Sequence, residues 1–438
     1  MKKVLVLGAG LVAGPTVHYL LDHEIEVTVA SIISSQAKEL VGNHPHGKAV
    51  ELDVSDKPAL TSLIKENDLT ISLLPATMHV MVAEICLDKN KHLVTSSYVK
   101  PEMRALDQRA KEAGLLFLNE LGLDPGIDHM SAMEVIDRVK KDGGTIVDFS
   151  SSCGGLPSPK ANDNPLGYKF SWSPKGVLLA ANNSARYLRD GKVVEVPGEE
   201  LFDHFHDIEI QGLGGFECYP NRNSLEYIEL YGLEDAKGFF RGTIRNQGHC
   251  ESWRKMVDFG MFGTEEADAS GLSYKQFMAR LLTGNTGTDP AKALMDKYDI
   301  PANAPLIEKL SWLGMFEDVP CPKDKIAPID LILERMLEKM MFNKGERDLV
   351  VLQHKFHVEY PDRKEEITCD LIDFGFPNGD SSMSRTVGLP AAVGARLILQ
   401  GKIKLTGVYI PNVPEIYVPV LKELANMNIK LNERVETK

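Results

Sequence analysis

The first 120 residues alternate short apolar runs with longer segments whose apolar residues recur at helical spacing. Such alternation is typical of a parallel sheet whose strands are joined by right-handed helical crossovers. We therefore predict an α/β fold that begins at the N-terminus. The predicted strands are 3–7, 26–30, 49–52, 69–74, 92–95 and 115–118, and the predicted helices include 11–22 and 35–41.

The pattern changes after about residue 124, where strand-like runs lie among many Gly, Pro and Asn residues. A Met- and Leu-rich stretch of helical spacing follows, and period-two alternation then returns and predicts antiparallel strands. The predicted strands are 145–150, 193–196, 349–353, 355–359, 366–372 and 405–409, and the predicted helices are 274–282, 331–341, 390–399 and 418–427, the last with Pro419 in its first turn.

These changes in the pattern of residues along the chain predict three domains, two of them discontinuous in sequence. Residues 1–124 and 390–438 form a Rossmann domain, on the expectation that the last elements pack back on the first ones. Residues 125–250 and 345–389 form a mixed α/β domain, and residues 251–344 form a smaller all-helical domain.

Charge and composition exclude several classes of protein. The net charge is −13 and no compensating basic stretch exists, so we expect no nucleic-acid partner. The N-terminal apolar run is too short for a signal peptide, and no run of about 18 apolar residues predicts a membrane span. The six cysteines are scattered without metal-ligand spacing, which favours reduced thiols, a cytoplasmic location and no metal site.

The segment after the first strand carries the pattern GxGxxA, which points to a bound dinucleotide. Gly8 allows a tight turn, Gly10 lets the backbone approach a pyrophosphate, and the small Ala13 allows close packing of helix on strand. The following helix would offer amide donors to phosphate, and Pro15 is tolerated early in it. We therefore assign Gly8, Ala9, Gly10, Leu11 and Val12 to a cofactor site.

The end of the second strand normally distinguishes NAD from NADP. An acidic residue there would bind the ribose of NAD, and an arginine would hold the extra phosphate of NADP. Ser31 and Ser34 stand there instead, with neither an acid nor an arginine beside them. The sequence therefore predicts NAD or NADP without choosing between them.

Later motifs, taken with this start, resemble the saccharopine dehydrogenases of the L-glutamate-forming type, including the corresponding part of bifunctional lysine-degrading enzymes. The resemblance spans essentially the whole chain and is weakest over 251–344. The segments that carry it are ISLLP at 71–75, TSSYV at 95–99, ELGLDPGIDH at 120–129, CGGLP at 153–157, NPLGYKFSWSP at 164–174, YPNRNS at 219–224, RGTIR at 241–245 and TVGLP at 386–390.

The resemblance implies a reversible hydride transfer between saccharopine and 2-aminoadipate 6-semialdehyde plus L-glutamate, in lysine metabolism. It also implies that the mixed α/β domain binds substrate and mediates dimerisation, so the expected partners are these small molecules and a second copy of the chain.

The candidate substrate residues follow from the same motifs. Saccharopine carries three carboxylates, and Arg222 and Arg245 are candidate partners because guanidinium binds carboxylate in a bidentate manner. Thr243 and Ile244 lie beside Arg245 and are expected to add contacts. The resemblance also implies substrate contacts from Ser97 and Tyr98; a buried tyrosine with a satisfied hydroxyl is the alternative for Tyr98.

Asp124 is expected either to stand beside the reacting amine, where it could stabilise an iminium or relay a proton, or to serve as a turn or N-cap for a helix starting near Ile127. Asp128 and His129 are expected to lie on that helix and support it. Cys153 is a second candidate proton relay or a packing residue. The catalytic candidates are therefore Asp124, Tyr98 and Cys153.

The remaining cofactor candidates lie after the second, fourth and fifth strands and in the WSP turn. His79 and Thr77 fall where a loop would pass the nicotinamide, although His79 could instead be a surface residue at a helix N-terminus. These candidates are Ser31, Leu74, Pro75, Thr77, His79, Ser96 and Ser173.

Two alternatives remain open. A carboxynorspermidine-type reductase of another imine would need to receive an amine where saccharopine offers a carboxylate, and Glu217 and Glu226 lie near the substrate motifs. A non-catalytic NAD(P)-sensing protein would be expected to have an empty substrate domain, against the populated substrate motifs seen here.

Overall fold

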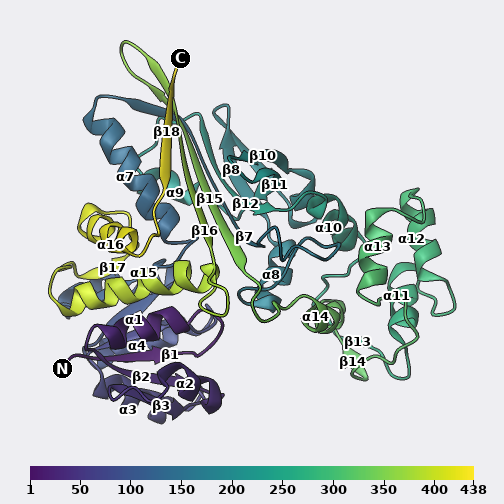
Figure 1. Ribbon diagram of the computed structural model, residues 1–438, viewed down its shortest axis with the longest axis horizontal. Coiled ribbons are helices and arrows are strands. Elements are labelled where there is room, and N and C mark those ends of the chain that lie inside the picture. The colour runs from purple at the N-terminus through teal and green to yellow at the C-terminus, as the bar shows by residue number, and fades with distance from the viewer. The chain divides into compact units, whose positions relative to one another are not determined.

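The computed structural model describes residues 1–438, which form two compact units. Unit 1 contains residues 1–146 and 358–438, and unit 2 contains residues 147–357. The predicted α/β class with an N-terminal Rossmann sheet is confirmed (Figure 1). The three-domain division and its all-helical domain stay predictions. No helix reaches the length and apolar character needed to cross a bilayer.

Unit 1 is built on a seven-stranded sheet in the order β17-β6-β5-β4-β1-β2-β3, in which every pair is parallel. The order reverses between β1 and β4, and α/β sheets bind ligands at such a switch point, outside the carboxyl ends of the strands. The strands are β1 (Lys3–Leu7), β2 (Glu26–Ser31), β3 (Gly47–Glu51), β4 (Leu69–Ser72), β5 (His92–Thr95), β6 (Leu116–Leu118) and β17 (Gly407–Tyr409).

Helices cover this sheet, and unit 1 also contains the antiparallel strands β16 (Lys364–Phe374) and β18 (Asn432–Thr437). The helices are α1 (Gly14–Asp22), α2 (Ser34–Val41), α3 (Lys57–Glu66), α4 (His79–Asp88), α5 (Pro101–Arg104), α6 (Asp107–Glu112), α7 (Ile127–Lys141), α15 (Ser382–Leu399) and α16 (Pro414–Asn426).

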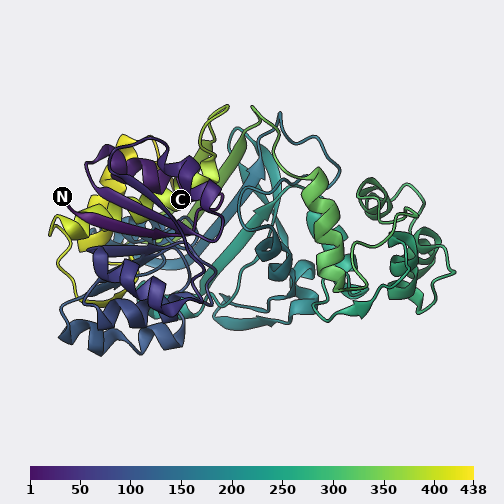
Figure 2. The same cartoon turned by 90° about the horizontal axis from the view of Figure 1, so that it is seen from below.

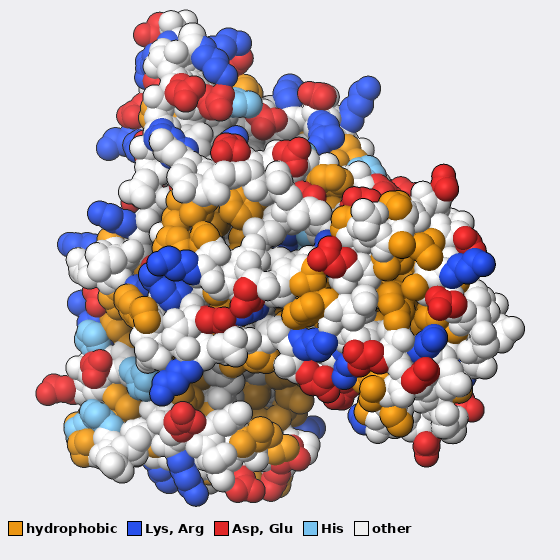
Figure 3. All heavy atoms as spheres, turned by 45° about the vertical axis from the view of Figure 1, so that its right-hand side comes forward, with side chains coloured by type: hydrophobic (Ala, Val, Ile, Leu, Met, Phe, Trp, Pro, Cys, Tyr) orange, Lys and Arg blue, Asp and Glu red, His pale blue; other side chains and the backbone are white.

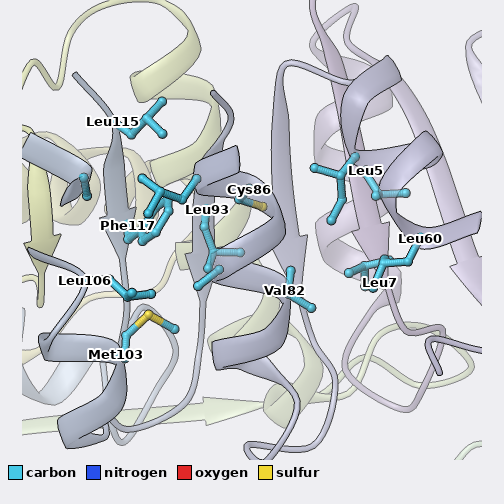
Figure 4. Packing of buried hydrophobic residues seen from close by; sticks show 14 of the residues in the cluster. Leu5, Leu7, Leu60, Val82, Cys86, Leu93, Met103, Leu106, Leu115 and Phe117 are labelled. Atoms are coloured by element: carbon cyan, nitrogen blue, oxygen red, sulfur yellow. The ribbon is translucent and has the colours of Figure 1, made fainter. Parts of the chain in front are cut away.

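The core of the Rossmann sheet is formed where the alternate apolar residues of its strands meet α3, α4 and the α5–α6 segment (Figure 4). Leu5 and Leu7 from β1 and Phe117 from β6 are fully buried there, together with Leu60 of α3 and Val82 of α4. Burying a side chain of this size contributes roughly 1.5–3 kcal/mol. This packing holds the carboxyl ends of the strands, and the loops that follow them, in fixed positions.

Helix α15 packs so closely on α1 that a small residue is needed at the contact. The Thr16 hydroxyl donates to the Gly388 carbonyl at 3.0 Å, and a Cβ at Gly388 would lie 2.7 Å from that hydroxyl oxygen. The two helices lie side by side (Figures 1 and 2). The C-terminal segment therefore returns to the N-terminal sheet.

Three differences from the sequence expectations concern the C-terminal third of the chain. The helix expected at 390–399 begins at Ser382, because the Ser381 side chain caps it by accepting from the Ser384 amide, and Pro390 lies inside it. The last helix begins at Pro414, so Pro419 is interior and not in the first turn. The strands expected at 349–353 and 355–359 are one continuous strand.

Unit 2 contains a mixed sheet in the order β10-β11-β12-β7-β15, with β8 beside β12 and β9 beside β8. The pairs β10–β11 and β11–β12 are antiparallel, and β12–β7 is parallel. The strands are β7 (Thr145–Pro157), β8 (Ala185–Arg189), β9 (Lys192–Val196), β10 (His206–Ile210), β11 (Gly214–Pro220), β12 (Gly238–Arg245) and β15 (Asp348–Glu359), with a small pair β13 (Ala267–Asp268) and β14 (Lys325–Ile326).

Helices α11 to α14 lie in the second half of unit 2, and α11 to α13 gather in one group (Figures 1 and 2). The helices are α8 (Pro174–Leu179), α9 (Glu226–Leu230), α10 (His249–Asp258), α11 (Tyr274–Thr283), α12 (Pro290–Tyr298), α13 (Pro305–Trp312) and α14 (Pro328–Lys339), with single 3₁₀ turns at Ala180–Asn182 and Gly198–Asp203.

Acidic and basic side chains are interspersed on the face shown in Figure 3, with apolar groups between them. Interspersed charges of both signs are typical of a solvated protein surface.

Candidate active site

The turn after β1 needs a glycine at its first position. The Gly8 amide donates to the Ala30 carbonyl of β2 at 2.9 Å, and Gly8 has a φ of +103°. A Cβ there would lie 3.2 Å from the Leu73 carbonyl oxygen at the end of β4. The turn is therefore hydrogen-bonded to β2 and lies close to the residue after β4, in a conformation that side chains disfavour.

The next residues fit a dinucleotide pyrophosphate. A Cβ at Gly10 would meet no atom within 4 Å, so the backbone at this point is open to a ligand. Helix α1 begins at Gly14 and not at residue 11, because the Ala13 amide donates to the Gly10 carbonyl and closes a turn first. Pro15 lies in the first turn of α1, as expected. Free amides at the start of this helix are suited to bind phosphate.

The other cofactor candidates of this turn and of β2 differ in exposure. Ala9 is buried, Val12 is half-buried, and Leu11 is exposed. Ser31 ends β2, and its hydroxyl oxygen accepts from the Ile33 amide at 3.2 Å. Ile32 and Ile33, which follow Ser31, are exposed.

His79 is the first residue of α4, yet its side chain is only 4% exposed, so its interpretation as a surface residue is wrong. Its Nδ1 lies 2.9 Å from the Ser72 hydroxyl oxygen, and its Nε2 lies 2.8 Å from that of Ser97. Burial, with the Lys100 ammonium nearby, lowers the pKa of His79 to about 4. The ring is therefore neutral near neutral pH and joins the end of β4 to the loop after β5.

The loop between β4 and α4 carries the other candidates of this segment. Leu74 is half-buried, and Pro75 and Thr77 are exposed. Ser96 is half-buried beside Gly122, where an added Cβ would lie 3.1 Å from the Ser96 Cβ. These loops all follow the carboxyl ends of neighbouring strands.

Tyr98 and Asp124 come together beyond β5 and β6. The Tyr98 hydroxyl donates to Asp124 Oδ1 at 2.9 Å, and Tyr98 is half-buried. Ser97 precedes this pair, with its amide donating to Thr95 Oγ1 and its carbonyl accepting from the Glu120 amide. The structure thus brings Ser97, Tyr98 and Asp124 onto one edge of the sheet.

Asp124 is not the N-cap of the helix that follows. Helix α7 begins at Ile127 as expected, but its N-cap residue is Gly126, which lacks a side chain to cap with. The Gly126 amide donates to Asp128 Oδ1 at 2.6 Å. Asp128 therefore supports the start of α7, and the Asp124 carboxylate is directed to Tyr98.

A buried pair behind this loop was not anticipated from the sequence. His129 Nε2 lies 2.8 Å from Glu120 Oε2, and both side chains are almost completely buried. Glu120 Oε1 accepts from the Val99 amide at 2.8 Å. The pair anchors the residue next to Tyr98, and the run ELGLDPGIDH would have shown it only if Glu120 had been considered as a partner of the His129 ring.

In unit 2, four of the substrate and proton-relay candidates lie on two adjacent strands. Cys153 of β7 is paired with Thr243 of β12 in register, and Ile244 and Arg245 follow directly. Cys153, Ile244 and Arg245 are buried and Thr243 is half-buried. These four candidates therefore form one continuous group.

Arg245 is held between two aromatic rings and forms no ion pair. Its guanidinium carbon lies 5.1 Å from the centre of the Tyr168 ring and 5.9 Å from that of Tyr219, and Nη1 donates to the Ile244 carbonyl at 2.9 Å. The side chain is 5% exposed, and its Nε has no hydrogen-bond partner. Burying a cation whose donors have no partner costs free energy, and binding of an anionic ligand would offset that cost.

The surroundings of Arg245 carry further polar groups that are not among the candidate site residues. His249 stacks on Tyr219, and burial together with Arg245 and Lys309 keeps the pKa of His249 well below its ordinary value. Glu217 accepts from the Gly248 amide with one oxygen and from the Cys250 amide with the other, each at 2.7 Å. The Glu217 carboxylate is therefore used to start α10.

Arg222 and Ser173 are the two exposed candidates of unit 2. Arg222 follows β11 with a φ of +53°, and its carbonyl accepts from the Arg186 amide. Ser173 is the N-cap of α8, and its hydroxyl oxygen accepts from the Gly176 amide at 3.3 Å. A capping role alone accounts for a serine at this position.

The switch-point sheet, the glycine turn and the open approach at Gly10 define a dinucleotide-binding α/β protein. Family models match most of the chain: the saccharopine dehydrogenase NADP binding domain over residues 4–118, and the saccharopine dehydrogenase C-terminal domain over residues 122–429. The chain belongs to the saccharopine dehydrogenase family.

Named relatives cover the chain from end to end. The saccharopine dehydrogenase [NADP(+), L-glutamate-forming] of Schizosaccharomyces pombe is 40% identical over 99% of both chains. The protein of the same name from Saccharomyces cerevisiae is 40% identical over 97% of this chain and 96% of its own. The mouse mitochondrial alpha-aminoadipic semialdehyde synthase is 37% identical over 98% of this chain but only 47% of its own.

A solved structure shares the whole fold. The apo saccharopine dehydrogenase (L-Glu forming) from Saccharomyces cerevisiae is 38% identical, with a TM-score of 0.89 over 100% of both chains. The predicted α/β fold with an N-terminal Rossmann sheet and a mixed second sheet is therefore confirmed.

Proposed function

We propose that this chain catalyses the NADP-dependent, L-glutamate-forming saccharopine dehydrogenase reaction of lysine metabolism. Saccharopine, NADP⁺ and water give L-glutamate, 2-aminoadipate 6-semialdehyde, NADPH and a proton, and the reaction is reversible. A nicotinamide cofactor supplies hydride acceptance or donation when it is bound. The chain's own residues then have to bind the carboxylates, orient the secondary amine and move protons.

The observation that carries the proposal is the unpaired guanidinium of Arg245. It is buried, lies between Tyr168 and Tyr219, and retains unused donors. Burial raises the pKa of both phenols, so the rings stay neutral and supply no negative charge. A carboxylate of saccharopine would supply the missing charge, and a polyamine nitrogen would not.

The catalytic assignment rests on Tyr98, Asp124 and Cys153. The hydrogen bond from Tyr98 supports a carboxylate at Asp124, which would stabilise an iminium or take a proton from the substrate amine. Cys153 would be the second proton relay. Ser97, Arg222, Thr243 and Ile244 would complete the contacts with substrate.

The cofactor assignment rests on the loops that follow the parallel strands. The turn from Gly8 to Val12 would hold the pyrophosphate, while Leu74, Pro75, Thr77 and Ser96 would line the nicotinamide side, with Ser173 as a further contact. His79, whose ring nitrogens are taken by Ser72 and Ser97, would support this loop from behind. NADP is favoured over NAD because Ser31 stands where an acid would repel the 2′-phosphate. Both family model and relatives carry NADP in their names.

Turnover tests the proposed activity directly. Purified protein is mixed with saccharopine and either NADP⁺ or NAD⁺, and the reduced nicotinamide is followed at about 340 nm. Turnover with NADP⁺ and release of L-glutamate in equal amounts is the expected result. Cofactor binding without turnover of saccharopine would contradict the proposal.

The cofactor preference has a test of its own in Ser31→Asp. A carboxylate at the end of β2 is expected to lower kcat/KM for NADP⁺ about 10- to 100-fold by repelling the phosphate, with little change for NAD⁺. Ser31→Ala is the matched control, since it removes the hydroxyl without adding charge. Equal losses for both cofactors would place Ser31 outside the phosphate site.

Two alternatives are less well supported. A carboxynorspermidine-type reductase would need a carboxylate to receive an amine, but both oxygens of Glu217 accept from backbone amides and Glu226 Oε1 accepts from the Asn223 amide nitrogen. A non-catalytic NAD(P) sensor gives no reason for a buried, ligand-ready arginine. Observed turnover would exclude the sensor.

We further infer that the protein is a cytoplasmic homodimer without nucleic-acid or membrane partners. The inference rests on the family resemblance and on the charge of −13. Analytical ultracentrifugation of the full chain would measure the mass, and a monomer at assay concentration would contradict the dimer.

A further inference from the structure

Three side chains of unit 1 form a chain of hydrogen bonds that ends at the candidate substrate loop. Ser72, the last residue of β4, lies 2.9 Å from His79 Nδ1, and His79 Nε2 lies 2.8 Å from the Ser97 hydroxyl. Ser72 is completely buried, His79 is 4% exposed, and Ser97 is half-buried. This series of hydrogen bonds therefore runs from the core of the sheet toward solvent.

The buried end of this chain determines which ring nitrogen of His79 carries the proton. His79 is the one side-chain hydrogen-bond partner of the Ser72 hydroxyl, and a buried O–H without an acceptor costs about 1–3 kcal/mol. Ser72 satisfies its O–H by donating to Nδ1, which makes Nδ1 the acceptor. A neutral imidazole then carries its proton on Nε2, which donates to Ser97.

The same reasoning fixes what Ser97 can offer to a ligand. Its hydroxyl oxygen accepts from His79, so its own O–H remains to be donated outward. Its backbone cannot turn away, because the Ser97 amide donates to Thr95 Oγ1 and its carbonyl accepts from the Glu120 amide. Accepting one hydrogen bond also strengthens the next donation in a chain.

We propose that His79, oriented by Ser72, is a positioning residue that holds the Ser97 hydroxyl as a hydrogen-bond donor to a carboxylate of the substrate. This inference rests on the proposed function, because saccharopine supplies the carboxylate. Both ring nitrogens of His79 are taken by serines, so His79 acts on the ligand through Ser97 and touches neither substrate nor cofactor. The neighbouring Tyr98–Asp124 pair would then act on a substrate already aligned by Ser97.

The first test measures the tautomer and needs no turnover. The full chain is labelled with ¹⁵N-histidine, and His79 is assigned by the signals missing from the spectrum of His79→Gln. We expect a protonated Nε2 and an unprotonated, hydrogen-bonded Nδ1 from pH 6 to pH 8 (roughly the assay range). A proton on Nδ1 would overturn the inference whether or not the protein turns over saccharopine.

The second test compares the Michaelis constants of two His79 variants with those of the wild-type enzyme. In His79→Gln the amide reaches the position of Nε2 and can still donate to Ser97, so KM for saccharopine should stay within about threefold of wild type. His79→Leu removes that donor, and KM for saccharopine should rise about tenfold while KM for NADP⁺ is unchanged. A rise in KM for NADP⁺ alone would overturn the inference.

Ser97→Ala provides the matched comparison. It should raise KM for saccharopine at least as much as His79→Leu, and the double variant should be no worse than Ser97→Ala alone, because His79 acts through that hydroxyl. Multiplied effects in the double variant would mean that His79 acts independently and would overturn the inference. Absence of turnover in the wild type would instead contradict the proposed function, and the tautomer measurement would still decide the arrangement of His79.

Discussion

The Tyr98 hydroxyl donates a hydrogen bond to Asp124 Oδ1 at 2.9 Å, joining the loop after β5 to the loop after β6. A phenol that donates favours the ionised form of its carboxylate partner, since only an oxygen without a proton is a pure acceptor. Asp124 is therefore prepared to meet a positive charge, which an iminium or a protonated secondary amine would provide.

Tyr98→Phe should lower kcat/KM for saccharopine about 10- to 100-fold, because a hydrogen bond to a charged group contributes about 1.5–3 kcal/mol. The affinity for NADPH, followed by its fluorescence, should be unchanged. The double variant Tyr98→Phe/Asp124→Asn tests whether Tyr98 acts through Asp124. If Tyr98 acts through Asp124, the double variant should be no less active than Asp124→Asn alone; a further loss would show that Tyr98 has a separate task.

Substitutions in the glycine turn distinguish effects on cofactor binding from effects on folding stability. Gly10→Ala adds a methyl group where no atom lies within 4 Å, and Gly10 is not among the residues with positive φ. The Tm of the apoprotein should therefore stay within about 2 °C of wild type, while the Kd for NADPH should rise tenfold or more (on the order of the loss when a backbone can no longer approach a phosphate).

Gly8→Ala is the contrasting variant. Its residue has a φ of +103°, and the new Cβ would meet the Leu73 carbonyl oxygen at 3.2 Å. We expect a loss of about 1–3 kcal/mol in the free energy of unfolding of the apoprotein. Thermal unfolding without cofactor distinguishes the two variants, and a Gly10→Ala protein as unstable as Gly8→Ala would refute the assignment of an open phosphate site.

Stability should depend on pH through His79. Its pKa is about 4 in the folded chain against 6.5 for the ordinary group, mainly because burial disfavours the charged ring and also because Lys100 is near. The unfolded chain therefore binds the proton more strongly, and the stabilisation present above pH 6.5 is lost as the pH falls toward 4. The loss amounts to about 3 kcal/mol at most.

Urea unfolding of wild type and His79→Gln at several pH values between about 7.5 and 4.5 measures this contribution. Burial also lowers the pKa of His92 and His206, so the wild type loses stability from several sites. The difference between the two proteins isolates His79, and curves that run parallel over this range would disprove the prediction.

Much of the fold could be predicted from the sequence because its helices and strands have clear local sequence patterns. The strands β1, β2 and β5 are apolar runs bounded by turn residues, and the glycine turn follows the first of them. What failed was the position of prolines: Pro390 and Pro419 suggested helix starts, whereas both lie inside helices. Proline excludes one hydrogen bond, and tertiary packing of the rest of the helix can outweigh that cost.

The site was predictable only as far as single motifs reach. The pairing of Tyr98 with Asp124 joins two segments 26 residues apart, and no local pattern encodes the distance between them. From the sequence His79 could be a surface residue, because it starts a helix. Its burial depends on Ser72 at the end of β4 and on Ser97 in the loop after β5, which the sequence does not place beside it. Likewise, the absence of an anionic partner for Arg245 is a property of the folded chain.

Arg245→Met should stabilise the protein while abolishing its activity. The guanidinium is buried without an ion pair, and replacing a buried charge by an apolar side chain of similar volume often stabilises a protein by about 1–4 kcal/mol. We therefore expect a higher Tm for the apoprotein and, because the substrate carboxylate loses its partner, a kcat/KM for saccharopine at least about 100-fold lower. Differential scanning calorimetry and the reduced-nicotinamide assay measure the two effects on the same preparation.

Arg385→Met supplies the matched control, because the same substitution there should have the opposite effect on stability. Arg385 is also buried, but its Nη1 lies 2.8 Å from both oxygens of Asp373, which is itself 8% exposed. Removing Arg385 leaves that carboxylate buried and uncompensated, at a cost of about 3–5 kcal/mol. Stabilisation at Arg245 with destabilisation at Arg385 would mean that the first arginine is kept for a ligand and the second for the fold. Equal destabilisation by both substitutions would mean that Arg245 is a structural residue, and the proposed carboxylate site would lose its main support.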